Sequence, residues 1–270
     1  MEGKKLRELK RDIFDNKGRL LLSKNTKITP NIKNLLYKHG ISLTEIDDSL
    51  KVEERVNKDI QKLKSHINHR NNHIFSKASN VLKTQIIESR EKPWGIYCNA
   101  LANYIDWLYT HSINVAILSI MIAAKSEYSD TKLRTICLGA LFHDVGKLLI
   151  PKKIINKGTT LDEFEIQLMR QHCELGKNTL SSYDLDPLCL NIIYQHHERL
   201  DGSGYPNGLT SEDIVQEAKI VMIADSIDAM TSNRPYKKAC SIEESIKYLE
   251  KESNKYDIEH LKTVKEILLF

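Results

Sequence analysis

Several residue types that define common protein classes are scarce in this chain of 270 residues. Glycine (11) and proline (6) are too few for a collagen-like, disordered or loop-dominated protein. The five cysteines are scattered, and no two have the Cys-x-x-Cys spacing of a zinc knot or a redox pair. We therefore expect a helix-rich globular protein with reduced cysteines, of which Cys137 and Cys240, in apolar stretches, belong to the core.

Long apolar runs and a strong charge bias are missing as well. The longest near-apolar segment, residues 113–124, is too short to span a bilayer, and the N-terminal sequence MEGKKLRELKRDIF lacks the apolar core of a signal peptide. Lys and Arg number 40 against 36 Asp and Glu, and a net charge of +4 is too small to indicate a nucleic-acid polymer as partner. We predict a cytoplasmic protein that contacts no membrane.

The first 50 residues predict a small α/β module with a regulatory role. A hairpin is indicated by Ile13-Phe14, the turn residues 15–18 and the apolar residues 20–22. Thr29-Pro30 is typical of a helix start, the helix extends to about His39, and residues 41–46 predict a returning strand.

Residues 51–94 predict a helical connector. They are strongly polar, and apolar residues recur at every third or fourth position, at Val52, Val56, Ile60, Leu63 and Ile67. This is the pattern of an amphipathic helix that packs on a neighbour, and the connector is also a candidate homodimer contact through residues 51–92. His66, His69 and His73 have no further ligand nearby and indicate a solvated face.

Residues 95–270 predict an all-helical domain, because no alternating run of strand type follows residue 95. The expected helices span residues 98–124, 131–142, 161–180, 187–197, 211–230 and 242–256. The predicted fold class is mainly α: a helical bundle with a small N-terminal α/β module.

Five histidines interrupt apolar stretches of these helices: His111, His143, His172, His196 and His197. Burying an imidazole without a partner costs about 1–3 kcal/mol, so five such positions favour a shared site over five unrelated core histidines. Two carboxylates follow the same logic. Asp144 adjoins His143, and Asp225 interrupts the segment AKIVMIADSIDAM, with Asp228 one turn later on the same side of the helix.

This set of side chains points to metal ions. No Lys or Arg lies within four residues of Asp225 to neutralise it, and a metal ion neutralises a buried carboxylate most completely. Imidazole and carboxylate ligands without thiolate suit iron, manganese, nickel or zinc. Seven candidate ligands are too many for one ion with open positions, so we expect two metals bridged by a carboxylate, about 3.5–4 Å apart as in phosphate-cleaving sites.

Three blocks of sequence carry a family resemblance. The segment His143-Asp144-Val145-Gly146-Lys147 resembles the HDxGK signature of HD-domain phosphohydrolases. Residues 196–206, HHERLDGSGYP, resemble the HHExxDGxGYP signature of the HD-GYP subgroup, and residues 224–237 look like a third block of that subgroup. The resemblance covers roughly residues 100–260 and implies an HD-type helical bundle, with residues 95–270 as the catalytic domain.

The resemblance also implies roles for individual residues. One metal would be held by His111, His143, Asp144 and Asp225, and Asp144 would bridge to a second metal held by His172, His196 and His197. The expected cofactors are two divalent ions, iron or manganese. Asp144 and Lys147 are the implied catalytic residues, and Lys147, Arg234, Lys237 and Tyr205 the implied substrate contacts. Trp107 occupies the place where some members have a glutamate for a third metal, which favours two ions.

The implied activity is hydrolysis of cyclic di-GMP to pGpG, and further to GMP, in bacterial second-messenger signalling. One alternative is an enzyme for a related substrate, such as cyclic GMP-AMP or a nucleotide monoester. Another is a receptor that binds cyclic di-GMP without cleaving it. The Gly-Tyr-Pro loop is an expected contact surface for partner proteins.

Overall fold

A computed structural model describes residues 13–14, 20–23, 26–27, 32, 55–232 and 239–270. The chain divides into two compact units, Met1–Arg55 and Val56–Phe270. In the first unit β1 (Ile13–Phe14) pairs antiparallel with β2 (Leu20–Leu22), which confirms the predicted hairpin. The predicted helix to His39, apart from Ile32, and the predicted strand at residues 41–46 lie outside the described residues.

The regular secondary structure of the second unit is helical in its described residues, and its one β-bridge there, between Asp201 and Thr210, is isolated. This confirms the predicted fold class for residues 56–270. Its elements are a helix at residues 55–64, η1 (His69–Asn71), α3 (Asn72–Ser89), η2 (Pro93–Gly95), α4 (Ile96–Tyr104), α5 (Asp106–Lys125), α6 (Asp130–Phe142), η3 (Val145–Leu149), α7 (Lys152–Ile155), α8 (Glu163–Arg170), α9 (His172–Leu180), α10 (Pro187–Gln195), α11 (Gln216–Thr231), α12 (Ile242–Lys251) and α13 (Ile258–Leu269).

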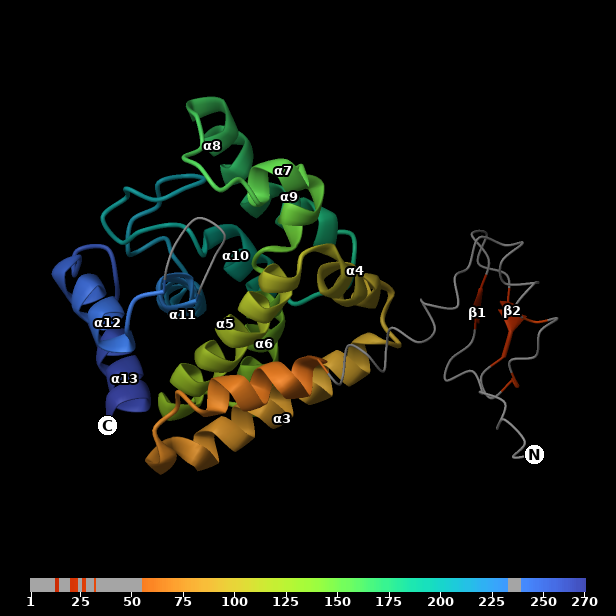
Figure 1. The fold of residues 1–270 in the computed structure, drawn as a ribbon, viewed down its shortest axis with the longest axis horizontal. Helices are drawn as coiled ribbons and strands as arrows, with labels where there is room; N and C mark the ends of the chain where they lie inside the picture. Colours follow the sequence, from red (N-terminus) through yellow and green to blue (C-terminus); the bar gives the residue numbers. More distant parts are fainter. Residues whose placement is uncertain (1–12, 15–19, 24–25, 28–31, 33–54, 233–238) are drawn as a thin grey trace. The chain divides into compact units, whose positions relative to one another are not determined.

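Helix α5 forms the centre of the bundle. It lies among the other helices in Figure 1 and packs against α3, α4, α6, α11 and α13. Its middle residues, from Ile113 to Ala123, are almost all buried. By length and composition it is apolar enough to cross a membrane, but 78% of its most apolar stretch is buried inside the protein. Burial on every side explains why this helix is apolar all round.

Local signals in the sequence set several helix ends. Ser129 caps α6 through its side chain, and Asp162 and Ser241 form capping boxes with the glutamates three residues later. Asp186 and Pro187 start α10 as N-cap and first-turn proline. Because these bonds satisfy otherwise free amides, the helices begin where the polar residues lie.

Four predicted helix boundaries are wrong. The span 98–124 is two helices, because Ile105 is extended at φ −145° and ψ 124° between α4 and α5. The span 161–180 is also two, divided at Gln171, and the span 211–230 begins as a helix only at Gln216. The last predicted helix ends at Lys251, and α13 follows it. At Ile105 and Gln171 the apolar periodicity continues across the break, so the pattern alone does not mark it.

The connector packs within the second unit. Val56, Ile60 and Ile67 are buried, and α3 packs on α5 and α6. His66, His69 and His73 are exposed, which confirms the solvated face.

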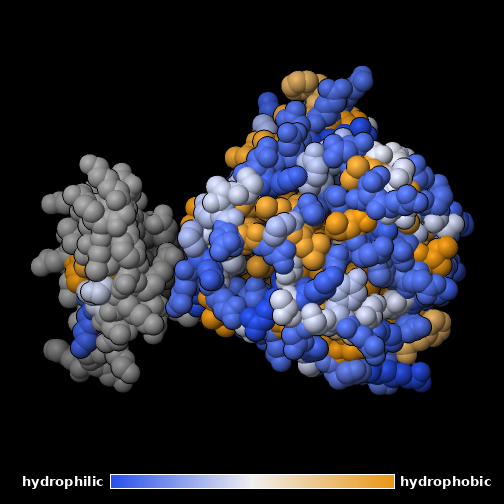
Figure 2. All heavy atoms as spheres, turned by 180° about the vertical axis from the view of Figure 1, so that it is seen from behind, coloured by the Kyte–Doolittle hydropathy of each residue, from blue (hydrophilic) through white to orange (hydrophobic). Residues whose placement is uncertain are grey.

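Hydrophobic side chains on the visible surface are scattered among hydrophilic ones (Figure 2).

The cysteines Cys98, Cys137, Cys173 and Cys189 are free and buried. The core prediction is confirmed for Cys137. It is wrong for Cys240, which is only half-buried because it lies in the segment between α11 and α12.

Candidate metal centre

Three helix ends and the interiors of two helices bring the seven predicted ligands together. His143 and Asp144 directly follow α6, His172 begins α9, and His196 and His197 directly follow α10. His111 and Asp225 lie within α5 and α11, the two helices that pack side by side across the centre. Six of the seven are buried, and His197 is half-buried.

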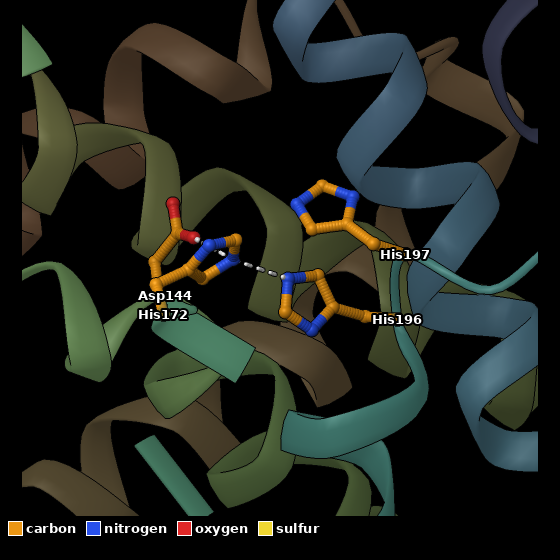
Figure 3. Close-up of side chains that lie close together, drawn as sticks. All are labelled: Asp144, His172, His196 and His197. Carbon is orange, nitrogen blue, oxygen red and sulfur yellow. Dashed lines mark hydrogen bonds and ion pairs between the residues drawn. The ribbon is translucent and has the colours of Figure 1, made fainter. Parts of the chain in front are cut away.

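The seven side chains form two groups, in each of which the ligand atoms lie within 4.8 Å of one another. One group contains Asp144, His172, His196 and His197 (Figure 3), and the other contains His111, His143 and Asp225.

Asp144 lies between the two groups. Its Oδ1 is 3.3 Å from His172 Nε2 in the first-named group. Its Oδ2 is 3.4 Å from His143 Nε2 and 3.7 Å from His111 Nε2 in the other. Its carboxylate therefore faces both, which is the position of a bridging ligand.

Hydrogen bonds at Nδ1 fix the orientation of four imidazoles. His143 donates to Ala140 O at 2.7 Å, His172 to Met169 O at 2.7 Å, and His196 to Ile193 O at 2.8 Å. Each acceptor is the carbonyl three residues earlier, in the last turn of a helix, where carbonyls lack a helical partner. His111 Nδ1 instead donates to Asp228 Oδ2 at 2.6 Å. Because Nδ1 carries the proton, Nε2 is left as the ligand atom.

The geometry of the group around His172 fits a cation. The Nε2 atoms of His172 and His196 face each other at 3.2 Å, and both rings carry their proton on Nδ1. Two lone pairs thus point at one another. Among the described residues, the buried Asp144 Oδ1 beside them accepts no hydrogen bond. Three electron-pair donors converge without a proton between them, and a metal ion satisfies all three.

The charge state of the centre follows from burial. Burial lowers the pKa of His172 to about 4, and Lys147 adds to the effect. Burial and neighbouring imidazoles also hold the pKa values of His196 and His197 well below the usual range. Burial alone would raise the pKa of Asp144, but Lys147 and the surrounding histidines outweigh it and hold that pKa well below its usual range. At neutral pH His172, His196 and His197 are therefore neutral and Asp144 is ionised, the forms that bind metals.

Lys147 brings a positive charge to the carboxylate of Asp144. Its Nζ lies 2.6 Å from Asp144 Oδ2, and the residue is 8% exposed. It lies in η3, which packs on α9. Gly146 permits that contact, because a Cβ there would lie 2.0 Å from the carbonyl oxygen of His172. The glycine of the first sequence block is thus required for close packing.

Hydrogen bonds and ring stacking hold the loop after His197 against the centre. The buried Glu198 carboxylate accepts the backbone amides of Asn207 at 2.8 Å and Leu209 at 2.9 Å. Asp201 accepts the amide and hydroxyl of Ser203 and so fixes the turn. The ring of Tyr205 stacks on His197, with centroids 4.7 Å apart and an interplanar angle of 30°.

The structure adds one functional residue and leaves two undescribed. Asp228 was noticed in the sequence only as a carboxylate one turn from Asp225, and its bond to His111 spans 117 positions of the chain, which no local pattern reveals. Arg234 and Lys237 lie outside the described residues. Trp107 donates a hydrogen bond from its indole nitrogen to Asn156 at 2.9 Å.

A cavity of about 480 Å³ adjoins the group that contains His111. Its walls come from the connector, α5, α11 and the C-terminal helices, and include Trp107, His111 and Asp228. Its volume lies within the range of small-molecule sites, about 300–1,000 Å³.

The sequence is similar to those of curated cyclic-dinucleotide phosphodiesterases. The chain is 40% identical over 160 residues to a cyclic di-GMP phosphodiesterase of Thermotoga maritima, over 58% of this chain and 44% of the relative. It is 34% identical over 142 residues to 3'3'-cGAMP-specific phosphodiesterase 3 of Vibrio cholerae, over 52% of this chain and 30% of the relative. The chain spans less than half the length of the curated relatives it matches.

A solved structure shares the fold. Bd1817, an HDG"Y"P protein from Bdellovibrio bacteriovorus, superposes with a TM-score of 0.55 at 18% identity, covering 96% of this chain and 94% of that one. The model of the HD-domain family matches residues 96–259, which include all seven clustered histidines and aspartates. The chain belongs to the HD-domain family, and its three sequence blocks are those of the HD-GYP subgroup.

Proposed function

We propose that this protein is a metal-dependent phosphodiesterase that hydrolyses cyclic di-GMP to linear pGpG, and pGpG further to GMP. The observation that carries the proposal is the position of Asp144, a buried carboxylate facing two groups of histidines with Lys147 beside it. A pair of divalent ions bridged by a carboxylate is the arrangement used for in-line displacement at phosphorus.

The proposed ligand sets follow the two groups. His111, His143, Asp225 and Asp144 would hold one ion, and His172, His196, His197 and Asp144 the other, with iron or manganese as the metal. Such ions supply Lewis-acid activation of water and charge neutralisation at the phosphate.

The chain's own cations complete the proposed site. Lys147 holds a fixed positive charge at the bridging carboxylate, where it stabilises negative charge on a non-bridging phosphate oxygen. Arg234 and Lys237 are proposed to bind the second phosphate, Arg through a planar fork and Lys as a point charge. The Tyr205 hydroxyl is a further proposed substrate contact. The cavity beside His111 offers room for part of a nucleotide.

The choice of substrate rests on the relatives. The Thermotoga relative carries the name of a cyclic di-GMP phosphodiesterase, and the Vibrio relative that of a cGAMP-specific one. The second candidate is therefore a phosphodiesterase for cyclic GMP-AMP. A receptor that binds cyclic di-GMP without cleaving it is less well supported, because both ligand groups are complete.

The test compares purified protein loaded anaerobically with iron or manganese on cyclic di-GMP, cyclic GMP-AMP and pGpG. Chromatography of the products and metal content per chain are measured together. We expect two metals and cleavage of cyclic di-GMP, with both lost in Asp144→Ala. Metal-loaded protein that binds cyclic di-GMP in an equilibrium assay but forms no pGpG is a receptor. Faster turnover of cyclic GMP-AMP overturns the proposed substrate.

Three further properties stay predictions: a cytoplasmic location, a homodimer through residues 51–92, and protein partners at the Gly-Tyr-Pro loop. Size-exclusion chromatography with light scattering tests the dimer, and labelled-protein imaging tests the location.

A further inference from the structure

His197 is held differently from the other four imidazoles of the centre. Within the described residues, no hydrogen bond reaches its ring, and its Nδ1 lies 3.8 Å from Asp225 Oδ2, beyond hydrogen-bond range. Figure 3 accordingly joins Asp144, His172 and His196 by dashed lines and leaves His197 unconnected. An imidazole without a hydrogen bond has no fixed orientation unless packing provides one.

Packing on Tyr205 provides that orientation. The two rings are stacked at 4.7 Å with an interplanar angle of 30°. The guanidinium carbon of Arg170, the last residue of α8, lies over the same tyrosine ring at 5.2 Å from its centroid. The ring of Tyr205 is thus in contact with both the His197 imidazole and the Arg170 guanidinium. Aromatic stacking and cation–π attraction both stabilise this arrangement.

The backbone of the loop fixes Tyr205 against His197. The amide of Tyr205 donates to the carbonyl of His197 at 3.1 Å, and the Glu198 carboxylate holds the loop just beyond the tyrosine. Gly204 permits this approach, because a Cβ there would lie 2.4 Å from the Cα of Glu198. Each residue around Tyr205 thus has a physical part in bringing its ring onto the imidazole.

We propose that Tyr205 is a positioning residue: its ring, stacked on His197 and in contact with Arg170, orients the His197 imidazole toward Asp144, His172 and His196. The affinity of this group for its metal therefore depends on the flat ring of Tyr205 and not on its hydroxyl. The inference rests on the proposed two-metal function and assigns Tyr205 a task beyond its proposed contact with substrate.

Three variants test this arrangement, with metal affinity as the readout. Tyr205→Phe keeps the ring and removes the hydroxyl, Tyr205→Leu removes the flat ring, and Arg170→Met removes the cation that lies over the ring. The matched control is Tyr128→Leu, which breaks a similar lysine–tyrosine contact, with Lys132 at 5.4 Å, away from the cluster. Each protein is loaded with manganese and titrated with a chelator, and the metal per chain is measured by mass spectrometry.

We expect two ions in the wild type, in Tyr205→Phe and in Tyr128→Leu. In Tyr205→Leu one of the two should be held 10–100-fold more weakly, the effect typical of residues that orient a metal-binding histidine. Arg170→Met should weaken the same ion by a smaller factor. Circular dichroism and the melting temperature of the chelator-treated proteins verify folding, and if Tyr205→Leu does not fold, Arg170→Met and Tyr205→Phe decide.

Two results overturn the inference: wild-type affinity for both ions in Tyr205→Leu and Arg170→Met, or an equal loss of affinity in Tyr205→Phe, which would assign the effect to the hydroxyl. Failure of the proposed activity looks different. A wild type that binds two ions but cleaves no cyclic dinucleotide contradicts the phosphodiesterase assignment alone, and the affinity test of Tyr205 still applies.

Discussion

A substitution at Asp228 distinguishes the two proposed metal positions, because it should affect only one of them. Its Oδ2 accepts the Nδ1 proton of His111 at 2.6 Å, and its Oδ1 accepts Asn114 Nδ2 at 2.8 Å and the Ser232 hydroxyl at 3.1 Å. Asp228→Asn leaves one neutral acceptor oxygen for His111 and Asn114, so the His111 bond is either lost or made to a weaker, uncharged acceptor. Because His111 has no backbone carbonyl in this role, its ring loses basicity in both cases and its fixed orientation in the first.

The expected size of the effect is large enough to measure. Removing a partner of a metal-binding histidine typically weakens the metal 10–100-fold, about 1.4–2.7 kcal/mol. Only the ion of His111, His143 and Asp225 should be affected, because His172 and His196 keep their bonds to backbone carbonyls. A chelator titration should therefore show one weakened step and one unchanged step.

Two control variants show which metal ion gives rise to the weakened step of the titration. Ser232→Ala removes one donor from Asp228 and keeps the bond to His111, so both steps should stay near wild type. His196→Ala disrupts the group that contains His172 and leaves the group that contains His111 intact. When Asp228→Asn is added to this variant, it should weaken the ion that remains, which the group of His111 holds. The reasoning is refuted if Asp228→Asn leaves both affinities unchanged in folded protein, or if it weakens the ion of His172 instead.

The remaining predictions concern the bridge, the packing and the loop. Asp144→Ala should abolish metal content and turnover together, and normal hydrolysis rates in this variant would disprove the role of the bridge. Gly146→Ala should lower the free energy of unfolding by about 3 kcal/mol in urea titrations, because its Cβ would meet the His172 carbonyl at 2.0 Å; a change under about 1 kcal/mol would contradict the packing argument. Glu198→Gln weakens the acceptor of two loop amides, costing about 1–3 kcal/mol, and limited proteolysis should cut residues 201–210 faster than in the wild type. Chelator should lower the melting temperature of metal-loaded wild type, because ions bound to the folded state stabilise it, and an unchanged melting temperature would argue against tight binding.

The candidate ligands could be read from the sequence because each breaks a local rule. A histidine or aspartate in an apolar helical stretch needs a partner, and the seven positions that break the rule lie in the two groups of the structure. The residues that hold the histidines in place break no such rule. Asp228 and Arg170 contact their partners only through tertiary packing. Tyr205 is predicted from its motif as a substrate contact, and the motif does not indicate that its ring stacks on His197.

The helix breaks were missed for a related reason. At Ile105 the apolar pattern runs on because Leu101, Ile105 and Leu108 are all buried, although the backbone changes direction between them. Periodicity reports which side chains face the core and not whether the chain stays in one helix. The break at Gln171 has a consequence for the site, since it places His172 at the start of α9 with its Nδ1 against a carbonyl of α8.

The hydrogen bonds from three histidines to carbonyls at helix ends also orient those histidines for metal binding. The carbonyls of Ala140, Met169 and Ile193 belong to the last turns of α6, α8 and α10, where carbonyls lose their usual partners four residues later in the helix. A histidine three residues later satisfies each one, and in doing so fixes its own tautomer with Nε2 toward the centre. Because backbone carbonyls cannot be changed by side-chain substitution, these three ligands are preorganised by the fold itself. His111 and His197 depend instead on the side chains of Asp228 and Tyr205, so each of the two groups contains one histidine whose orientation a single substitution can release.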